Sequence, residues 1–294
     1  MPSAKDFETS VTPTWCPGCG NFGMWQALRG AYEELGWDLS GFAVVWGIGC
    51  HGNGADFTRC QGFHALHGRA LPVATGLVLT RPDLKVVVEM GDGDCYGIGG
   101  NHLLHSCRRN IAMTAIVHDN QVYGLTTGQA SPTTEHLVRT PSTPTGVLEQ
   151  PVNAVGLAVA EGATFVARGF AGDVPHLQAL LVAALSHKGF ALVDVLQPCV
   201  TWNKLNTFGW FRERVYKLDE SGHDASDRAK ALELSLTAFH EMTCTPEECR
   251  VPIGVFYRVE GVETYQDGLT HVDRPSWRYA IGPRDVAATM STLT

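Results

Sequence analysis

The chain has 294 residues, of which 44% are hydrophobic and 18% are charged. This length suits one large domain or two small ones, and the composition excludes an intrinsically disordered chain. The 22 Lys and Arg residues against 30 Asp and Glu residues give a net charge of −8, which argues against a protein that binds nucleic acid or an anionic membrane mainly by charge.

Along the chain, the spacing of apolar residues predicts strands that alternate with helices. Apolar residues recur at helical spacing in Phe22–Leu35 and again after Asp173, which can cap a helix. Short continuous apolar runs are typical of strands that are buried on both faces of a parallel sheet. The pattern indicates an α/β fold with a doubly wound, mainly parallel sheet. The expected strands are Phe42–Ile48, Lys85–Met90, Thr114–Val117 and Phe190–Leu196, and further helices are expected at Leu177–Leu185 and Asp227–Met242.

Two segments depart from this alternation. Thr126–Pro151 is rich in Thr, Pro, Ser and Gly and is long for a simple connection, so we expect a functional loop. From Val251 onward the periodicity fades, and the aromatic residues in Tyr257–Thr294 suit either contact with a partner chain or a loose terminus. We therefore divide the chain into an N-terminal segment with a helix (1–40), an α/β domain (41–210) and a C-terminal helix with a tail (211–294).

A cation site is predicted where the strand Lys85–Met90 ends in Gly91-Asp92-Gly93-Asp94. Glycines let the backbone approach an anionic ligand, and a carboxylate can hold a hard cation, although a simple turn has the same pattern. The next strand ends at Asn120, and parallel strands bring their carboxyl ends to one edge of the sheet. Asp92, the Asn120 amide oxygen and the Val122 carbonyl could then supply three ligands of an octahedral Mg²⁺, with water and a diphosphate as the others.

The nine cysteines form the second candidate site. An odd number of cysteines without a visible signal peptide indicates a cytoplasmic protein with reduced thiols, unless some bind a metal. Cys16 and Cys19 have ligand spacing, and with Cys50 and Cys199 they could hold a zinc ion or a 4Fe–4S cluster. Spacing alone does not choose between these metals, or between a metal site and buried thiols. The remaining cysteines are expected to be thiols without a metal: Cys60, Cys95, Cys107, Cys244 and Cys249.

The Gly-Asp-Gly segment followed by Asn120 resembles the signature of thiamine diphosphate (TPP) enzymes. The continuation Tyr123–Gln129 (YGLTTGQ) makes the chain similar to the β subunit of 2-oxoacid:ferredoxin oxidoreductases, and most similar to the 2-oxoglutarate type. The resemblance extends over most of the chain, from about residue 12 to 210. Its other blocks are WCPGCG at Trp15–Gly20, GIGC at Gly47–Cys50, HGRALPVATG at His67–Gly76 and QPC at Gln197–Cys199.

The resemblance implies a fold and a set of cofactors. The domain 41–210 would be the diphosphate-binding domain of a TPP enzyme, and the segment 1–40 would help to bind a cluster. A 4Fe–4S cluster would be held by Cys16, Cys19, Cys50 and Cys199, and Mg²⁺ by Asp92, Asn120 and Val122. No catalytic side chain is assigned. TPP would be contacted by Ile48, Gly49, Cys50, His51, Gly91, Gly93, Asp94, Gly124 and Leu125.

The implied activity is oxidative decarboxylation of a 2-oxoacid, for which we expect 2-oxoglutarate, to acyl-CoA and CO₂. Electrons would pass singly through the cluster to ferredoxin, and the reaction could run in reverse as a reductive carboxylation. Alternatives are pyruvate or another 2-oxoacid as substrate, a TPP decarboxylase or synthase subunit without redox function, and a zinc-binding partner subunit that is not an enzyme. Many relatives carry lysine in place of Thr127 and a basic residue in place of Asn53, which leaves the exact 2-oxoacid open.

A partner is expected because half of a TPP site is missing. We find no second set of strands and helices for the aminopyrimidine, and no glutamate to activate it, so a separate α subunit should supply both and the coenzyme A site. Near the site, His51 suits contact with the cofactor or a structural role, and Arg69 suits binding of a carboxylate or of loop carbonyls. His102 and His105 are expected to pack behind the site.

Overall fold

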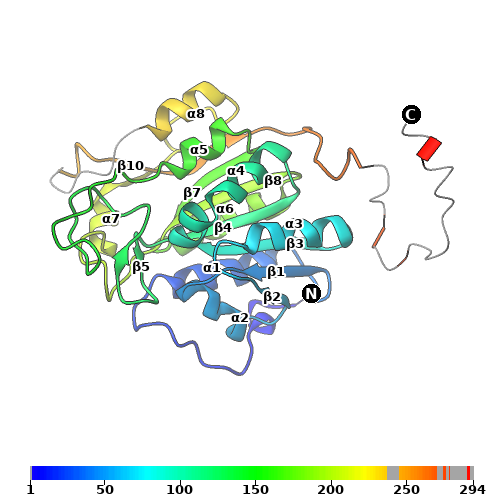
Figure 1. Ribbon diagram of the computed structural model, residues 1–294, viewed down its shortest axis with the longest axis horizontal. Helices are drawn as coiled ribbons and strands as arrows, with labels where there is room; N and C mark the ends of the chain where they lie inside the picture. The colour runs from blue at the N-terminus through cyan, green and yellow to red at the C-terminus, as the bar shows by residue number, and fades with distance from the viewer. Residues whose placement is uncertain (1, 237–244, 270–273, 276–277, 279–289, 292–294) are drawn as a thin grey trace.

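The computed structural model describes residues 2–236, 245–269, 274–275, 278 and 290–291, and an eight-stranded sheet forms its centre (Figure 1). The strands are β1 Phe42–Trp46, β2 Gln61–His64, β3 Lys85–Gly91, β4 Met113–Asp119, β7 Phe165–Phe170, β8 Phe190–Leu196, β9 Val215–Lys217 and β10 Val251–Arg258. Their order is β2-β1-β3-β4-β8-β7-β10-β9. All neighbours pair in parallel except β10 and β7, which are antiparallel. The mainly parallel sheet confirms the predicted fold class.

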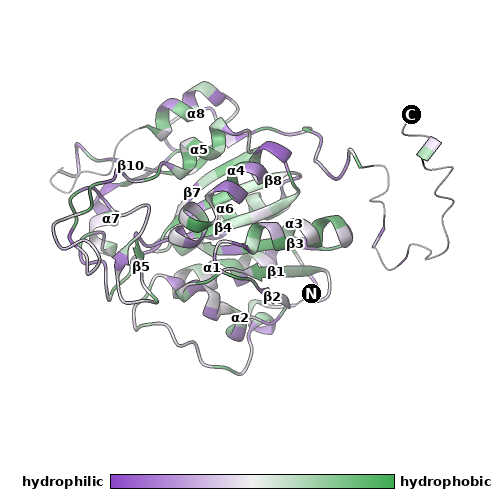
Figure 2. Ribbon diagram, viewed as in Figure 1, coloured by the Kyte–Doolittle hydropathy of each residue, from purple (hydrophilic) through white to green (hydrophobic). Residues whose placement is uncertain are grey.

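Helices cover both faces of the sheet (Figure 1). On one face lie α1 (Asn21–Glu34) and α6 (Val174–Ser186), and on the other lie α3 (Ala70–Thr80), α4 (Gly100–Arg109), α5 (Ala154–Ala160) and α8 (Arg228–Ser235). Figure 2 shows α5 coloured hydrophobic along its length, whereas much of α4 is hydrophilic. No helix in the described ranges has both the length and the apolar character to cross a membrane.

Shorter elements connect this framework. They are the 3₁₀ helices η1 (Ala4–Phe7) and η2 (Cys50–Asn53), the π-helical turn η3 (Gly93–Ile98), the helices α2 (Gly54–Phe57) and α7 (Phe208–Arg214), and the paired strands β5 (Val122–Tyr123) and β6 (Gln129–Ala130). The loop predicted between Thr126 and Pro151 contains only β6 as regular structure. The predicted cap of α6 is present, since Asp173 Oδ1 accepts from His176 N at 3.2 Å.

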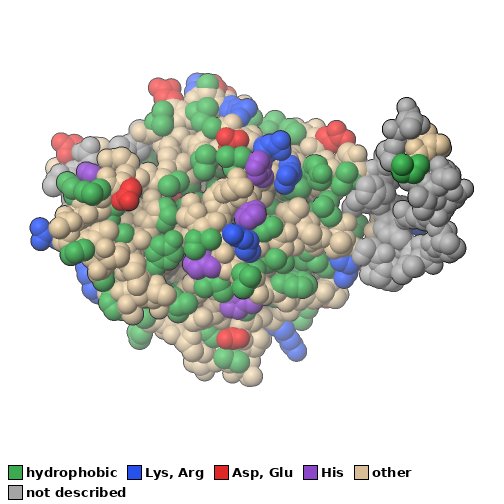
Figure 3. Space-filling view, in the orientation of Figure 1, with side chains coloured by type: hydrophobic (Ala, Val, Ile, Leu, Met, Phe, Trp, Pro, Cys, Tyr) green, Lys and Arg blue, Asp and Glu red, His purple; other side chains and the backbone are tan. Residues whose placement is uncertain are grey.

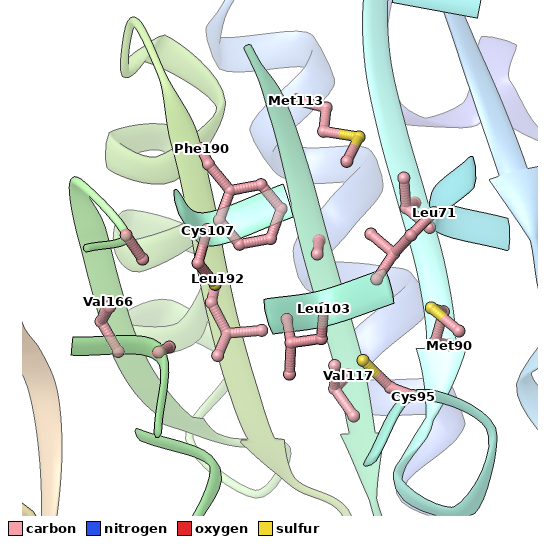
Figure 4. Close-up of a cluster of buried hydrophobic side chains, with 14 of the residues drawn as sticks. Leu71, Met90, Cys95, Leu103, Cys107, Met113, Val117, Val166, Phe190 and Leu192 are labelled. Atoms are coloured by element: carbon pink, nitrogen blue, oxygen red, sulfur yellow. The ribbon is translucent and has the colours of Figure 1, made fainter. Parts of the chain in front are cut away.

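The core explains why continuous apolar runs form these strands. Every residue of β4 and β8 is buried, because helices lie above and below them. Figure 4 shows Leu103 and Cys107 of α4 pointing toward Val117 and Leu192 of the sheet. The carboxyl ends of the central strands are therefore rigidly placed, and side chains that follow them are positioned with little freedom.

Because Leu192 is fully buried in the middle of β8, Leu192→Ala should lower the free energy of unfolding by about 2–5 kcal/mol through lost burial and a new cavity. Urea unfolding followed by tryptophan fluorescence measures this change. The matched control is Leu148→Ala, at a leucine that is 75% exposed, which should change stability by no more than about 0.5 kcal/mol. Equal effects of the two variants would contradict the assignment of Leu192 to the core.

The four predicted strands are β1, β3, β4 and β8, and the other strands of the sheet were missed. β10 begins at Val251, where we expected the periodicity to fade, and together with β9 it lies in the segment that we expected to hold only a helix and a tail. Pro252 and Gly254, which has φ +129°, are residues that rarely occur inside a strand, so the sequence pattern did not indicate β10. A register shift also interrupts the pairing of β10 with β7. The predicted helix Asp227–Met242 is α8 up to Ser235, and residues 237–242 lie outside the described ranges.

The cysteines without a predicted metal role differ from one another. Cys60, Cys95 and Cys107 are free thiols, as expected. Cys249 is disulfide-bonded, so the prediction of a free thiol was wrong there, and Cys244 lies outside the described residues. Cys249 therefore takes part in a cross-link that the polar sequence around it did not indicate.

Candidate functional site

The predicted cofactor residues follow three neighbouring strands, β1, β3 and β4. Trp46 pairs with Glu89, and Gly91 pairs with His118, so the three strands end at the same edge of the sheet. Ligands of α/β proteins bind outside the carboxyl ends of the strands, where the connecting loops diverge. The turn after β3 is the π-helical η3, which turns the chain sharply at Gly93.

These loops surround one small cavity of about 80 Å³ that is partly open to solvent. All of the residues that we expected to contact TPP or Mg²⁺ line it, although no ligand is present to show the contacts. They are Ile48, Gly49, Cys50, His51, Gly91, Asp92, Gly93, Asp94, Asn120, Val122, Gly124 and Leu125. The cavity is also lined by His67, Tyr123 and Thr126, to which the sequence assigned no role.

The buried Asp92 carboxylate shares a hydroxyl with a second carboxylate. Thr133 Oγ1 lies 2.7 Å from Asp92 Oδ2 and 2.8 Å from Asp119 Oδ1. A hydroxyl has one hydrogen to donate, so Thr133 cannot form a full hydrogen bond with both carboxylates at once. Burial raises the pKa of Asp92 to about 6, whereas burial and the nearby Asp194 and Asp92 raise the pKa of Asp119 well above its usual range. Of the two carboxyl groups, Asp119 therefore holds a proton more readily, and Asp92 is the more readily ionised oxygen donor.

One oxygen of the Asp94 carboxylate is held by the protein, and the other has no hydrogen-bond partner among the described residues. Its Oδ1 accepts from Gly68 N at 2.6 Å and lies 2.8 Å from His67 Nδ1. A Cβ on Gly47 would lie 1.7 Å from Asp94 Oδ2, so only glycine lets the end of β1 approach this carboxylate. Burial raises the pKa of Asp94, and the hydrogen bonds with Gly68 and His67 oppose that effect. Asp94 thus fixes one wall of the cavity to the loop that precedes α3.

His51 places a neutral imidazole on the cavity wall. Its side chain is buried, its ring lies 5.3 Å from that of His118, and its Nε2 has no hydrogen-bond partner among the described residues. Burial, with His118 as a further cause, lowers the pKa of His51 well below its usual value. A buried polar atom without a partner costs free energy, so a bound ligand would offset that cost.

The four cysteines predicted to bind a cluster lie together beside this cavity, and all four are free thiols. Cys50 follows β1 and lines the cavity, Cys199 follows β8, and Cys16 and Cys19 precede α1. A Cβ on Gly124 would lie 3.5 Å from Cys50 Sγ and 3.8 Å from Cys199 Sγ. Burial, and then the nearby thiols of Cys199, Cys50 and Cys16, raise the pKa of Cys19 to about 12.

The arrangement of ligands bears on which metals fit. Within the part of the chain that the structure describes, no three His, Cys, Asp or Glu side chains are placed to hold one metal ion. A structural zinc ion needs four ligands around a single centre, whereas a 4Fe–4S cluster takes each thiolate on a different iron. The magnesium set needs only one acidic side chain, because Mg²⁺ keeps water and phosphate ligands.

Other predicted residues lie around the cavity but not in it. Arg69 Nη1 donates to Gly68 O at 3.1 Å and to Ile98 O at 3.4 Å, so of its two predicted roles the structure shows binding of loop carbonyls. His102 and His105 belong to α4 and do not line the cavity. Figure 3 shows histidine and basic side chains gathered in the middle of the face turned to the viewer, over the region of α3 and α4.

Two family models together match most of the chain. Residues 20–195 match the family described as "Thiamine pyrophosphate enzyme, C-terminal TPP binding domain", and residues 199–274 match the family for the C-terminal part of the pyruvate ferredoxin oxidoreductase beta chain. The 2-oxoacid:ferredoxin oxidoreductase subunit beta of Sulfolobus sp is 46% identical over 267 residues, which cover 87% of this chain and 85% of that protein. The chain belongs to the β subunits of 2-oxoacid:ferredoxin oxidoreductases.

Further relatives of this β subunit family include the 2-oxoglutarate oxidoreductase subunit KorB of Mycobacterium tuberculosis. It is 46% identical over 199 residues, which cover 68% of this chain and 53% of that protein. Among solved structures, a 2-oxoglutarate:ferredoxin oxidoreductase from Magnetococcus marinus with 2-oxoglutarate, coenzyme A and succinyl-CoA bound is 37% identical. It matches 100% of this chain and 96% of its own, with a TM-score of 0.88. The chain is therefore an enzyme subunit with a TPP-binding domain, and a β subunit implies an α subunit as partner.

Proposed function

We propose that this β subunit holds Mg²⁺ and TPP in the cavity beyond β1, β3 and β4, and a 4Fe–4S cluster on Cys16, Cys19, Cys50 and Cys199. The enzyme would convert 2-oxoglutarate and coenzyme A to the acyl-CoA and CO₂ and reduce ferredoxin, and the reverse carboxylation would use reduced ferredoxin. One observation carries the proposal: Cys50 lines the cavity while its thiol lies beside Cys199. One loop thus serves both the carbon chemistry and the electron transfer.

Different residues of the cavity would bind Mg²⁺ and contact TPP. When bound, TPP supplies the carbanion chemistry that releases CO₂, and the cluster accepts one electron at a time. Asp92, the more readily ionised of the two acids, would hold Mg²⁺ with the oxygens of Asn120 and Val122. His51 Nε2 would donate or accept a hydrogen bond at the cavity wall, where it has no partner among the described residues.

The short distance between the two sites supports single-electron transfer. Gly124 lies between the cavity and the thiols, and it has no side chain to separate Asn120 from Cys50. A TPP enzyme that passes on electrons singly needs such an acceptor near its cofactor. A decarboxylase or synthase without redox function would have no use for four thiols at this place.

The relatives support 2-oxoglutarate as the substrate. The Mycobacterium tuberculosis and Magnetococcus marinus proteins are both named for it. Thr127 and Asn53 are uncharged here, and neither lines the cavity, so the second carboxylate of 2-oxoglutarate would need a cation from elsewhere. We propose that the α subunit supplies that cation, the aminopyrimidine site with its glutamate, and the coenzyme A site.

The test is to purify the chain anaerobically, alone and with its α subunit, and to measure iron, acid-labile sulfide, TPP, the EPR spectrum and ferredoxin reduction. We expect the cluster in both preparations and turnover only in the complex, with 2-oxoglutarate preferred over pyruvate. Full turnover by the isolated chain would show that the second half of the TPP site lies here. TPP without iron would favour a non-redox TPP subunit, and zinc without TPP would favour a partner that is not an enzyme.

A further inference from the structure

Gln197 lies between the two proposed sites. It directly follows β8, two residues before Cys199, and its side chain is 1% exposed. Its backbone N–H donates to Asp119 O at 2.8 Å, which ties it to the end of β4. A Cβ on Gly20 would lie 2.9 Å from both Cγ and Nε2 of Gln197, so the segment that contains Cys19 packs directly on this side chain.

The side-chain amide of Gln197 contacts a member of each proposed site. Its Nε2 donates to Cys19 Sγ at 3.4 Å and to Pro198 O at 3.1 Å. Its Oε1 accepts from Asn120 Nδ2 at 3.2 Å. These contacts use both hydrogens of the amino group and one lone pair of the oxygen.

The orientation of both amides follows from one fixed acceptor. Pro198 O can only accept, so the Gln197 amino group must face it, and Oε1 must face the opposite way. The Oε1 atom of Gln197 then requires a donor. Asn120 must therefore be oriented with its Nδ2 toward Gln197. Asn120 Oδ1 is left on the other side, where it accepts from Val122 N at 3.1 Å beside the cavity.

We propose that Gln197 is a positioning residue that joins the magnesium site to the cluster: it aims the Asn120 oxygen at the cation and donates a hydrogen bond to the Cys19 thiolate. The inference rests on the proposed function, since it assumes that Asn120 and Cys19 bind their metals. An N–H···S bond stabilises the more negative, reduced cluster and so raises its potential. An Asn120 side chain without its acceptor can rotate, which weakens the hold on Mg²⁺ and TPP.

Two variants separate the two contacts. Gln197→Met keeps the length of the side chain and removes both contacts. We expect a more negative cluster potential and an affinity for TPP in the presence of Mg²⁺ that falls about fivefold, as for the net loss of one hydrogen bond. Gln197→Glu keeps an oxygen for Asn120 but offers at most one hydrogen in place of two. Its potential should also fall, while its TPP affinity should stay within about twofold of wild type.

The measurements are EPR-monitored redox titration and calorimetric TPP titration of the complex with its α subunit. The control is Gln178→Met on α6, where the amide donates to Glu34 away from both sites and both quantities should stay at the wild-type value. A wild-type complex that contains cluster and TPP, with Gln197→Met unchanged in either quantity, would overturn the inference and leave the proposed function intact. Absence of cluster or TPP from the wild-type complex would instead overturn the proposed function and the inference with it.

Discussion

Replacement of Cys199 by serine is expected to remove the 4Fe–4S cluster or to convert it to another form, and to abolish electron delivery to ferredoxin. Cys199 follows β8, and its thiol lies beside Cys50 at the edge of the cavity. A serine hydroxyl is a much poorer iron ligand than a thiolate, and three thiolates do not close the site. Iron and sulfide analysis with an anaerobic EPR spectrum measures the loss, and reduction of ferredoxin by the complex measures its consequence.

The matched control is Cys60→Ser. Cys60 is a free thiol of similar, intermediate exposure that does not line the cavity, so this variant should keep its iron. A Cys199→Ser protein with full iron content and an unchanged EPR signal would remove Cys199 from the cluster ligands.

Asp92→Ala should lower the affinity for TPP and Mg²⁺ by at least about tenfold, because a charged interaction of roughly 1.5–3 kcal/mol is lost from a site that also holds a diphosphate. Asp92 is 2% exposed and would present an anionic oxygen to the cation. Asn120→Ala should have the same effect on a smaller scale, because its amide oxygen is neutral. The complex is first stripped of TPP and Mg²⁺. Titration with TPP at a fixed Mg²⁺ concentration then measures the affinity of each variant.

Asp83→Ala provides the control for these two variants. Asp83 is an exposed carboxylate that forms an ion pair with Arg81 just before β3, at the opposite end of that strand from Asp92. The Asp83→Ala variant should leave the affinity for TPP at the wild-type value. Wild-type titrations of both Asp92→Ala and Asn120→Ala would place the magnesium site elsewhere.

The sequence predicted the part of the site that depends on strand order. Continuous apolar runs identify β3 and β4, and adjacent parallel strands must bring Asp92 and Asn120 to one edge. Thr133 could not be found in this way, because it lies in the long loop after β6 and follows no strand of the main sheet. Gln197 directly follows the predicted strand β8, but its hydrogen bond to Cys19 does not depend on strand order. β7 was missed because it contains Arg168, whose ion pair with Asp194 of β8 at 2.9 Å makes a charged residue compatible with a buried strand.

The place of Cys50 on the cavity wall also limits how the enzyme can be altered. A substitution there would change the shape of the cavity and remove a proposed cluster ligand in the same step. The two properties cannot be engineered separately through this loop. Changes meant to tune only the electronic behaviour would have to be sought on the side of Cys16, which does not line the cavity.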